Sequence, residues 1–405
     1  MNLLEDLPVP QRRAIDVVRE VAAEKDVRPY LVGGPVRDLL LGRHSIDIDL
    51  TLEEGSSTLA RALAKRVEGR VRSFPQFLTY KVIANGFPEI DITTARKERY
   101  RQPGALPAVT AGLLKDDLMR RDFSINAIAL DLLHPVLHDP SGGEADIAAR
   151  VVRVLHEQSF IDDPTRIFRA VRLAARLGFS LEPHTAELMD QAIASNALST
   201  VSKERIWREL FLAMDEQDAP VILTELRDRG VLDVLFGRRG NGDLRERLDA
   251  IRAQIEANPS VDRYVLYTGV ILRGDASPID FEGSGFSQKR ARAVVEIGND
   301  LPRIEESLAG AIDDRERFRI YRSISAEMRT VIASERPEEV QHLRRFTEFE
   351  SFTLPLRGND LEVPGGPHVA KALEQTREAV FNGRIPPDQA RSYAREVAKR
   401  LMEER

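Results

Sequence analysis

Two aspartates separated by a single residue carry the clearest chemical signal in this sequence. Asp47 and Asp49 lie in segment 45–52, where apolar and polar residues alternate and predict a strand. Side chains two apart on a strand project from the same face, so both carboxylates should emerge together while Ile48 and Leu50 enter the core. Carboxylates bind Mg²⁺ together with water and substrate phosphates. The pair indicates metal-dependent chemistry on a nucleotide, whereas Asp-x-Asp taken alone more often marks a solvated strand edge.

A pair of glycines just upstream strengthens the nucleotide interpretation. Gly33 and Gly34 follow a predicted strand at 30–32 and precede a short amphipathic helix that Gly42 closes. Glycine lets the backbone approach a phosphate closely, and the N–H groups at a helix start favour anions. The strand, the glycines, the helix and the Asp-x-Asp strand form one compact unit that is typical of a nucleotide site.

The elements around this unit predict a mixed sheet with flanking helices. Helices are expected at 9–23 and 56–67, and strands at 70–74, 79–84 and 89–93. In the last strand Ile90 and Ile92 should point inward and Asp91 the other way. If this strand lies beside Asp47 and Asp49, Asp91 supplies a third carboxylate; otherwise it is a polar residue on a half-buried strand.

Two later segments carry the basic side chains that a nucleotide needs. Segment 117–129 predicts a helix whose arginines could face a triphosphate, although salt bridges to neighbouring aspartates are the simpler alternative. In segment 160–179 Asp162 or Asp163 should cap a helix that ends at Gly178. Four arginines share one face of that helix, where they could bind an anion or simply be solvated. These arginines are Arg166, Arg169, Arg172 and Arg176.

The helix start also offers a means of reading a base. An Asp carboxylate accepts hydrogen bonds from exocyclic amines, and an Arg guanidinium donates to ring nitrogens and carbonyls. Asp163 and Arg166 together could therefore recognise the edges of C and A without a nucleic-acid template. Upstream of both segments, residues 95–109 are basic, contain Pro and Gly and show no period, so they predict a loop that is functional or merely solvated.

These motifs together resemble the signature of the tRNA nucleotidyltransferase and poly(A) polymerase family, and of its class II CCA-adding and A-adding enzymes in particular. The matching segments are Gly-Gly-x-Val-Arg-Asp, Leu-Leu-Gly and Asp-x-Asp, then Arg-Arg-Asp-Phe-Ser-Ile-Asn-Ala and Asp-Asp-x-x-Arg. Ser124 stands where the family usually has Thr, and Asp162 where it has Glu. Segment 100–109 is more like that of members that add only the terminal A.

The resemblance implies a fold, a reaction and a set of site residues. The fold is α+β, with a polymerase β-type nucleotidyltransferase head that has a mixed sheet, followed by an all-helical neck, body and tail. The expected reaction moves nucleotides from ATP, and CTP, to the 3′ end of tRNA, with Mg²⁺ on Asp47 and Asp49 and with Asp91 as a third catalytic acid. The expected nucleotide-binding residues are Gly33, Gly34, Arg37, Asp38, Arg121, Asp122, Asn126, Asp162, Asp163, Arg166, Arg169 and Arg172.

Length and composition set the limits within which this interpretation must hold. The chain has 405 residues, 42% apolar, and we expect a head at 1–150, a nucleotide-selecting neck at 151–215, a body at 216–305 and a tRNA-binding tail at 306–405. It has no cysteine, which excludes disulfides and thiolate metal sites. The start of the chain has no signal-like segment, so a cytoplasmic protein without membrane or DNA partners is expected.

Several other functions share parts of this sequence signature. An enzyme that adds only A shares the pocket residues with one that adds CCA, so these residues do not separate the two. A poly(A) polymerase shares the catalytic signature but resembles the sequence less. A non-catalytic RNA-binding relative would lack the metal carboxylates, and a metal phosphohydrolase needs more ligands than His138 and Asp139 supply.

Overall fold

The computed structural model describes residues 3–43, 47–237, 243–274, 276–277 and 281–403. The backbone divides into two compact units, Met1–Glu246 with Ser277–Ser287 and Arg247–Ala276 with Gln288–Arg405. The first unit contains every residue expected at the nucleotide site. The predicted division into head, neck, body and tail stays a prediction.

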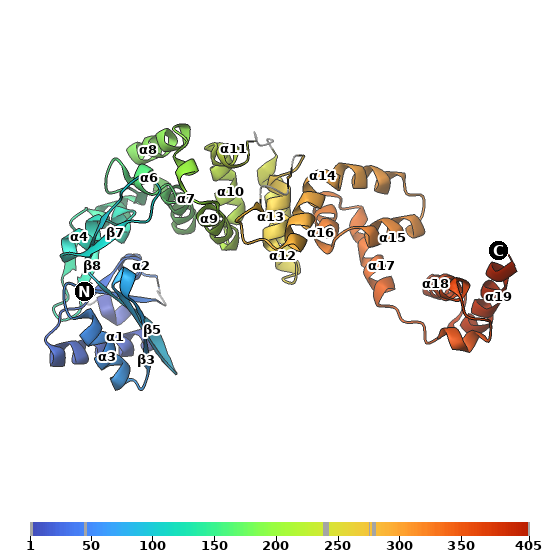
Figure 1. The fold of residues 1–405 in the computed structure, drawn as a ribbon, viewed down its shortest axis with the longest axis horizontal. Coiled ribbons are helices and arrows are strands. Elements are labelled where there is room, and N and C mark those ends of the chain that lie inside the picture. The colour runs from blue at the N-terminus through green and yellow to red at the C-terminus, as the bar shows by residue number, and fades with distance from the viewer. Residues whose placement is uncertain (1–2, 44–46, 238–242, 275, 278–280, 404–405) are drawn as a thin grey trace. The chain divides into compact units, whose positions relative to one another are not determined.

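A mixed sheet forms the first half of the first unit (Figure 1). Among the described residues seven strands run in the order β3-β4-β5-β2-β1-β8-β9, and β2 and β5 are parallel while the other neighbours are antiparallel. The strands are β1 (Tyr30–Val32), β2 (Ile48–Leu52), β3 (Arg70–Phe74), β4 (Thr79–Ala84), β5 (Phe87–Thr94), β8 (Ala129–Asp131) and β9 (Leu137–His138). The mixed sheet and the strands predicted at 30–32, 70–74 and 79–84 are confirmed. The strand expected at 45–52 is described from Ile48, because 44–46 lie outside the described residues.

Helices cover the sheet and supply the loops around the site. Helices α1 and α3 pack against each other and against β5, which confirms the helices predicted at 9–23 and 56–67. The helices of this part are α1 (Val9–Lys25), α2 (Gly34–Leu40), α3 (Ser56–Arg66), α4 (Leu114–Met119) and α5 (Gly143–Ala149).

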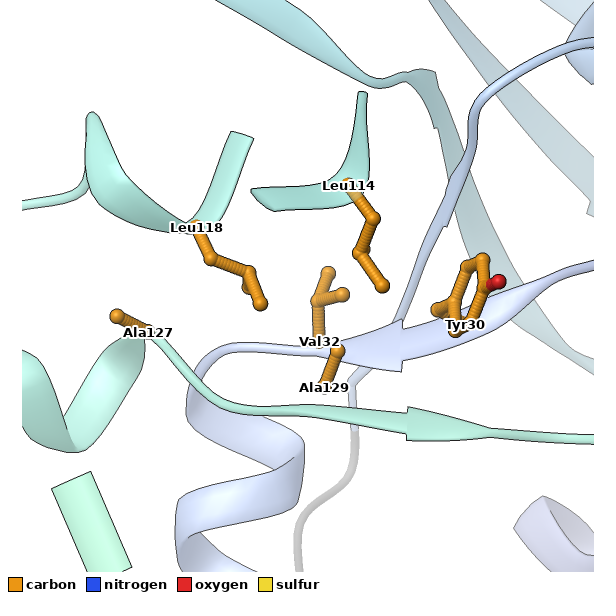
Figure 2. Packing of buried hydrophobic residues seen from close by; sticks show 6 residues of the cluster. All are labelled: Tyr30, Val32, Leu114, Leu118, Ala127 and Ala129. Carbon is orange, nitrogen blue, oxygen red and sulfur yellow. The ribbon is translucent and has the colours of Figure 1, made fainter. Parts of the chain in front are cut away.

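Helix α4 is held on the sheet by a small apolar cluster. Leu114 and Leu118 on α4 face Tyr30 and Val32 of β1 and Ala129 of β8 (Figure 2). All of them are less than 10% exposed, and burying such side chains stabilises the packing by roughly 1.5–3 kcal/mol each relative to exposure. The cluster fixes the end of α4, from which Arg120 and Arg121 follow directly.

Residues 96–111 differ from the predicted loop. The ends of the segment pair as an antiparallel hairpin of β6 (Arg96–Arg99) and β7 (Ala108–Ala111), with Arg96 opposite Ala111 and Arg99 opposite Ala108. Only residues 100–107 connect the two strands. Hydrogen bonds between the two strands satisfy backbone groups that an open loop would leave to water. The sequence does not predict the hairpin, because Pro and Gly at its centre are typical of a loop and the flanking strands are short.

The rest of the chain is helical, as the sequence predicts. From Pro183 to Glu403 the described residues contain helices and no strand, and a short parallel pair, β10 (Val151–Val152) with β11 (Ser180–Leu181), precedes them. After α5, the helices of the first unit are α6 (Ser159–Asp162), α7 (Arg166–Leu177), α8 (Pro183–Ala194), α9 (Lys203–Asp215), α10 (Ala219–Asp228) and α11 (Val231–Phe236). Helix α12 (Leu244–Ala257) begins at the boundary between the units.

The second unit has its own core of packed helices. Gly269 lies where α13 and α14 meet, and a Cβ there would come within 2.6 Å of Ile297. The helices are α13 (Arg263–Ile271), α14 (Gln288–Gly310), α15 (Asp314–Ser323), α16 (Ala326–Glu335), α17 (Glu339–Ser351), α18 (Pro367–Phe381) and α19 (Ala390–Glu403). None of the helices found in the described residues is both long and apolar enough to span a membrane.

Candidate active site

Asp49 and Asp91 stand opposite each other on the parallel strands β2 and β5. Their strand neighbours Ile48, Leu50 and Ile90 are buried beneath the sheet, so the two aspartates emerge on the other face. Burial raises the pKa of Asp49 to about 6, and the negative charges of Asp91 and Asp47 add to the rise. The structure thus brings three carboxylates close enough to repel one another.

Asp91 forms an ion pair with a lysine of the neighbouring strand. The Lys81 ammonium on β4 lies 3.3 Å from Asp91 Oδ2 and 3.2 Å from Glu89 Oε2. Asp91 lies beside the cleft that Asp47 and Asp49 line, and does not line it itself. Whether Asp91 joins the metal site stays a prediction.

Asp47 and Asp49 have the chemistry that a hard divalent cation requires. Carboxylate oxygens are the ligands that such ions prefer, and a cation would offset both the burial and the acidic neighbours that raise the Asp49 pKa. The described residues contain no group of three or more His, Cys, Asp or Glu side chains that could hold a metal ion by themselves. Water and substrate oxygens would therefore have to complete the coordination, as is usual for Mg²⁺.

A cleft of about 750 Å³ opens beside Asp47 and Asp49. Of the described residues that line it, nine are arginines and six are Asp or Glu. Its walls come from α2, the hairpin of β6 and β7, the segment after α4, and α7 with α9. The cleft suits an anion of nucleotide size, since arginine binds phosphate oxygens in pairs of hydrogen bonds.

The glycine turn before α2 brings an arginine against the backbone. Gly33 has a φ of 77°, which favours glycine, and a Cβ there would lie 2.6 Å from Arg121 Nη1 and would force that guanidinium to move. Arg121 Nε is buried and has no hydrogen-bond partner among the described residues. Arg121 therefore retains a donor for a ligand, although its Nη2 already bonds Asp117 Oδ2 at 3.1 Å. Gly34 lines the cleft next to this turn.

The Arg37 side chain is bonded to neighbouring protein side chains. Its side chain is 5% exposed, and it donates to Asp38 Oδ1 at 2.9 and 2.8 Å and to Asn126 Oδ1 at 2.6 Å. Burial lowers the Arg37 pKa, and the charge of Asp38 opposes that shift. Arg37, Asp38 and Asn126 all line the cleft, but their mutual bonds show that they also hold α2 to the segment after α4.

The helix predicted at 117–129 is wrong beyond residue 119. Helix α4 ends at Met119, and a 3-10 turn, η3 (Ser124–Asn126), follows. The Ser124 N–H donates to the Arg153 carbonyl at 2.9 Å, and Phe123 forms a bridge with Val154. Pairing with these distant residues replaces the helical hydrogen bonds, which no local pattern reveals. The break turns Arg120 and Arg121 into the cleft.

Asp122 links the sheet part of the unit to α7. Its Oδ1 accepts from Asn126 Nδ2 at 3.1 Å, and its Oδ2 accepts from Arg169 Nε at 3.0 Å. Burial alone would raise the Asp122 pKa, but the charge and hydrogen bonds of Arg169, with the bond from Asn126, lower it to about 2. Asp122 is therefore a buried, ionised carboxylate that positions Arg169 at the cleft.

The arginine face predicted on α7 does not act as one surface. Arg166 is 4% exposed and donates to Ser159 Oγ at 2.6 Å and to the Arg120 carbonyl at 3.0 Å. Arg172 turns to α9, where it bonds Glu209 at 2.9 Å and Glu216 at 3.2 Å, and it does not line the cleft. Arg166, Arg169 and Arg176 do line it. The expected capping also differs, because Thr165 rather than Asp162 or Asp163 precedes the first turn of α7.

Asp163 and Arg205 connect the hairpin to the start of α7. Asp163 Oδ1 accepts from Thr165 Oγ1 at 2.7 Å and from Arg205 Nη2 at 2.8 Å. The other terminal nitrogen of Arg205 donates to the Gly104 carbonyl at 2.7 Å, and the Gly104 N–H donates to the Asp162 carbonyl at 3.1 Å. Asp162 thus acts through its backbone and lies outside the cleft. The tip of the hairpin is thus tied to the backbone of Asp162 and, through Arg205, to the side chain of Asp163.

Sequence reasoning missed several residues that line the cleft. Glu98 is partly buried and accepts from Arg120 Nη1 at 2.8 Å, while Arg96 Nη2 lies 3.2 Å from the same oxygen. Tyr100 and Arg43 also line the cleft. Arg96, Glu98 and Tyr100 recur with the period of two that indicates one face of a strand. The prediction of a loop over 95–109 does not use this signal.

Two family models match parts of this chain. Residues 29–153 match the family model described as poly A polymerase head domain, and 178–237 match the probable RNA and SrmB-binding site of polymerase A. An A-adding tRNA nucleotidyltransferase of Halalkalibacterium halodurans is 38% identical over 246 residues, which cover 59% of this chain and 57% of that protein. One of Geobacter sulfurreducens, also A-adding, is 30% identical over 407 residues, which cover 93% of this chain and 46% of that protein.

The fold matches a solved structure as well. An apo form of a CCA-adding enzyme superposes with a TM-score of 0.86 at 23% identity, covering 100% of this chain and 98% of that one. The likeness confirms the predicted α+β head followed by helices. This chain spans about half the length of the two curated relatives, at 57% and 46%.

Proposed function

Because residues 29–153 and 178–237 match models of polymerase A domains and the curated relatives are tRNA nucleotidyltransferases, we propose that this chain belongs to the tRNA nucleotidyltransferase and poly(A) polymerase family and transfers nucleotides from ATP and CTP to the 3′ end of tRNA. Pyrophosphate is the other product, and no nucleic-acid template takes part. The observation that carries the proposal is the position of Asp47 and Asp49 at a cleft lined by nine arginines among the described residues. Such a site suits a triphosphate whose α-phosphate faces the acids.

Mg²⁺ is the metal that we propose for Asp47 and Asp49. When bound, it would neutralise the triphosphate and lower the pKa of the attacking ribose hydroxyl. Asp49 lies on a central strand of the sheet, and burial together with its acidic neighbours disfavours the negative charge of its carboxylate, so a bound cation would be favourable there. Asp91 supports the site by adding negative charge beside Asp49.

The phosphates are proposed to lie between the glycine turn and the arginines. Gly34 provides close approach of the backbone, and Arg121 offers the buried Nε that has no partner among the described residues. Arg169 is oriented towards the cleft by Asp122. Holding the triphosphate in one orientation contributes to rate because it removes the entropy of alignment from the reaction.

The base is proposed to pair with Asp163 and Arg166. Asp163 Oδ1 is occupied by Thr165 and Arg205, so Oδ2 is the atom that we assign to an exocyclic amine. Both C and A carry such an amine next to a ring nitrogen that accepts a hydrogen bond, whereas G and U carry a carbonyl at the corresponding position. An ionised Asp accepts and does not donate, which favours C and A.

Addition of A alone to a tRNA ending in CC is the form of this reaction that the names of the two relatives described above favour. Both curated relatives described above are named A-adding, and segment 100–109 is similar to that of A-adding members. Full CCA addition is the second candidate, because the Asp163 and Arg166 pair serves both bases.

Primer extension tests the proposal and separates the two products. The purified protein is supplied with Mg²⁺ and a tRNA that ends before CCA, after C or after CC, and with each labelled nucleotide in turn. We expect one A on the tRNA ending in CC. Addition of both C residues to the shortest tRNA would replace the A-adding form by CCA addition, and long A tails would indicate a poly(A) polymerase. No incorporation on any tRNA would contradict the proposal.

A further inference from the structure

Two large apolar side chains remain exposed inside the charged cleft. Phe77 is 44% exposed and Leu106 is 69% exposed, and both line the cleft together with Pro107 and Val109. The described residues around them are mostly arginines and acids. Exposed apolar groups gathered in a binding cleft commonly contact a ligand, whereas scattered ones on the outer surface do not.

The backbone holds Phe77 in place although its ring is not needed for the core. Phe77 ends a short 3-10 turn, η2 (Pro75–Phe77), that joins β3 to β4. Its carbonyl accepts from Arg96 Nη1 at 2.7 Å and from Thr79 Oγ1 at 3.1 Å. The turn is therefore fixed to the hairpin and to β4, and the ring projects from a rigid support.

Leu106 is supported in a similar way by the tip of the hairpin. Two residues earlier, Gly104 is bonded to the Asp162 carbonyl and to Arg205, and it packs so closely on Thr200 that a Cβ would lie 2.3 Å from Thr200 Oγ1. Leu106 follows from this anchored glycine and remains in solvent. Neither side chain owes its position to burial of its own surface.

A nucleobase attached to a phosphate backbone fits this combination of surfaces. Bases stack on flat apolar groups regardless of sequence, while neighbouring arginines neutralise the backbone. The proposed base-reading pair, Asp163 and Arg166, lies at the start of α7, whereas Phe77 belongs to the β3–β4 connection of the sheet. Two bases must meet at this cleft, one on the incoming nucleotide and one at the end of the acceptor.

We propose that Phe77, with Leu106, forms a platform on which the last base of the acceptor RNA stacks. The inference rests on the proposed function, since it assigns the acceptor end of that same cleft. Stacking there would hold the 3′-terminal ribose near Asp47 and Asp49 without reading the identity of the base by hydrogen bonds. The platform is thus a binding element for the RNA and not for the incoming triphosphate.

A fluorescent base tests the platform without any turnover. An RNA minihelix carries 2-aminopurine as its last base and a 3′-deoxy end, and its fluorescence is titrated with each protein. Stacking quenches 2-aminopurine, so wild-type protein should quench it, and Phe77→Ala should lose most of the quenching and bind about tenfold more weakly. Phe77→Tyr, which keeps the ring, should retain both the quenching and the affinity of wild type. Leu106→Ala should give a quenching and an affinity between those of wild type and those of Phe77→Ala.

Control variants separate stacking from loss of fold. Val136→Ala truncates another apolar residue, 56% exposed and outside the cleft, and should behave as wild type. Phe77→Leu keeps apolar volume without a ring and should also lose the quenching, which covers the case in which Phe77→Ala does not fold.

Several outcomes would overturn the platform. The first is quenching by Phe77→Ala or Phe77→Leu that equals the quenching by wild type. The second is an absence of quenching by wild type. The third is quenching of 2-aminopurine riboside triphosphate, and not of the RNA, that depends on Phe77. Failure of the proposed function is distinguishable, because it would appear as absent incorporation by wild-type protein in the primer-extension assay, which the binding assay does not use.

Discussion

Asp122, which is buried, and Arg169, which is about half exposed, form an ion pair across 47 positions of sequence. Asp122 follows α4 in the sheet part of the first unit, and Arg169 lies on α7, so the pair joins the two walls of the cleft. Removing Arg169 would leave the Asp122 charge buried without its cationic partner, a change that typically costs about 3–5 kcal/mol, whereas removing Asp122 would leave the Arg169 charge partly solvated. An Arg169→Ala variant would therefore lose stability as well as any contact with the substrate.

The Asp122 pKa makes this pair sensitive to acid. Its folded-state pKa of about 2 lies below its ordinary value of 3.8, so the ionised pair stabilises the fold above pH 3.8, and this contribution is lost as the pH falls from there to about 2. The difference corresponds to about 2 kcal/mol at neutral pH, of which about half remains near pH 3. In urea unfolding, Asp122→Asn should be less stable than wild type at pH 7, with a smaller gap at pH 3. A gap that stays constant with pH would contradict this assignment.

Gly104 should control how firmly the hairpin tip is held. Alanine there combines a φ of 71° with a Cβ 2.3 Å from Thr200 Oγ1, so we expect Gly104→Ala to release residues 100–107. Trypsin should then cut after the exposed Arg101 several times faster than in wild type. Gly86→Ala is the matched control, because Gly86 has a φ of 69° and nothing within 4 Å of an added Cβ. Equal cleavage of the Gly104 and Gly86 variants would show that the tip is not anchored at Gly104.

The choice of base should depend on Asp163. Asp163→Asn keeps an oxygen for Arg205 and Thr165 but replaces the other acceptor by an amide donor. We expect the preference for ATP over GTP to fall by about tenfold or more, because a hydrogen bond to a charged acceptor is lost and a carbonyl becomes acceptable. The ratio of kcat/KM for the two nucleotides measures this effect. An unchanged ratio, as expected for the exposed Asp16→Asn control, would remove Asp163 from base reading.

Local patterns predicted most of the sheet. The runs at 30–32, 70–74 and 79–84 combine apolar alternation with turn residues at their ends, and these strands have the predicted bounds. The sequence does not predict that Asp49 lies opposite Asp91. The order of strands in a sheet depends on pairing between distant segments, which local patterns do not reveal. Register Asp49–Asp91 lies on the one parallel pair among the described strands of the large sheet.

Side-chain partners from distant segments explain what the sequence did not reveal. Arg166, Arg169 and Arg172 have the spacing of a common face on α7, yet they bond Ser159, Asp122 and Glu209 respectively. Helical spacing predicts which residues share a face but not which acids will meet it. The end of α4 at Met119 has the same cause, since Ser124 pairs with backbone beyond the helix.

The catalytic role of the acids is tested most directly by transfer of labelled AMP to a tRNA ending in CC, compared between wild type and Asp49→Asn with Mg²⁺. This substitution would remove a metal ligand without removing packing, since Asp49 is only partly buried in the cleft wall. We predict that wild type extends the tRNA by one A with one pyrophosphate, and that Asp49→Asn is slower by about 10³-fold or more. Both proteins should bind the tRNA with similar affinity. Comparable rates of AMP transfer would contradict the assignment of this cleft as the active site.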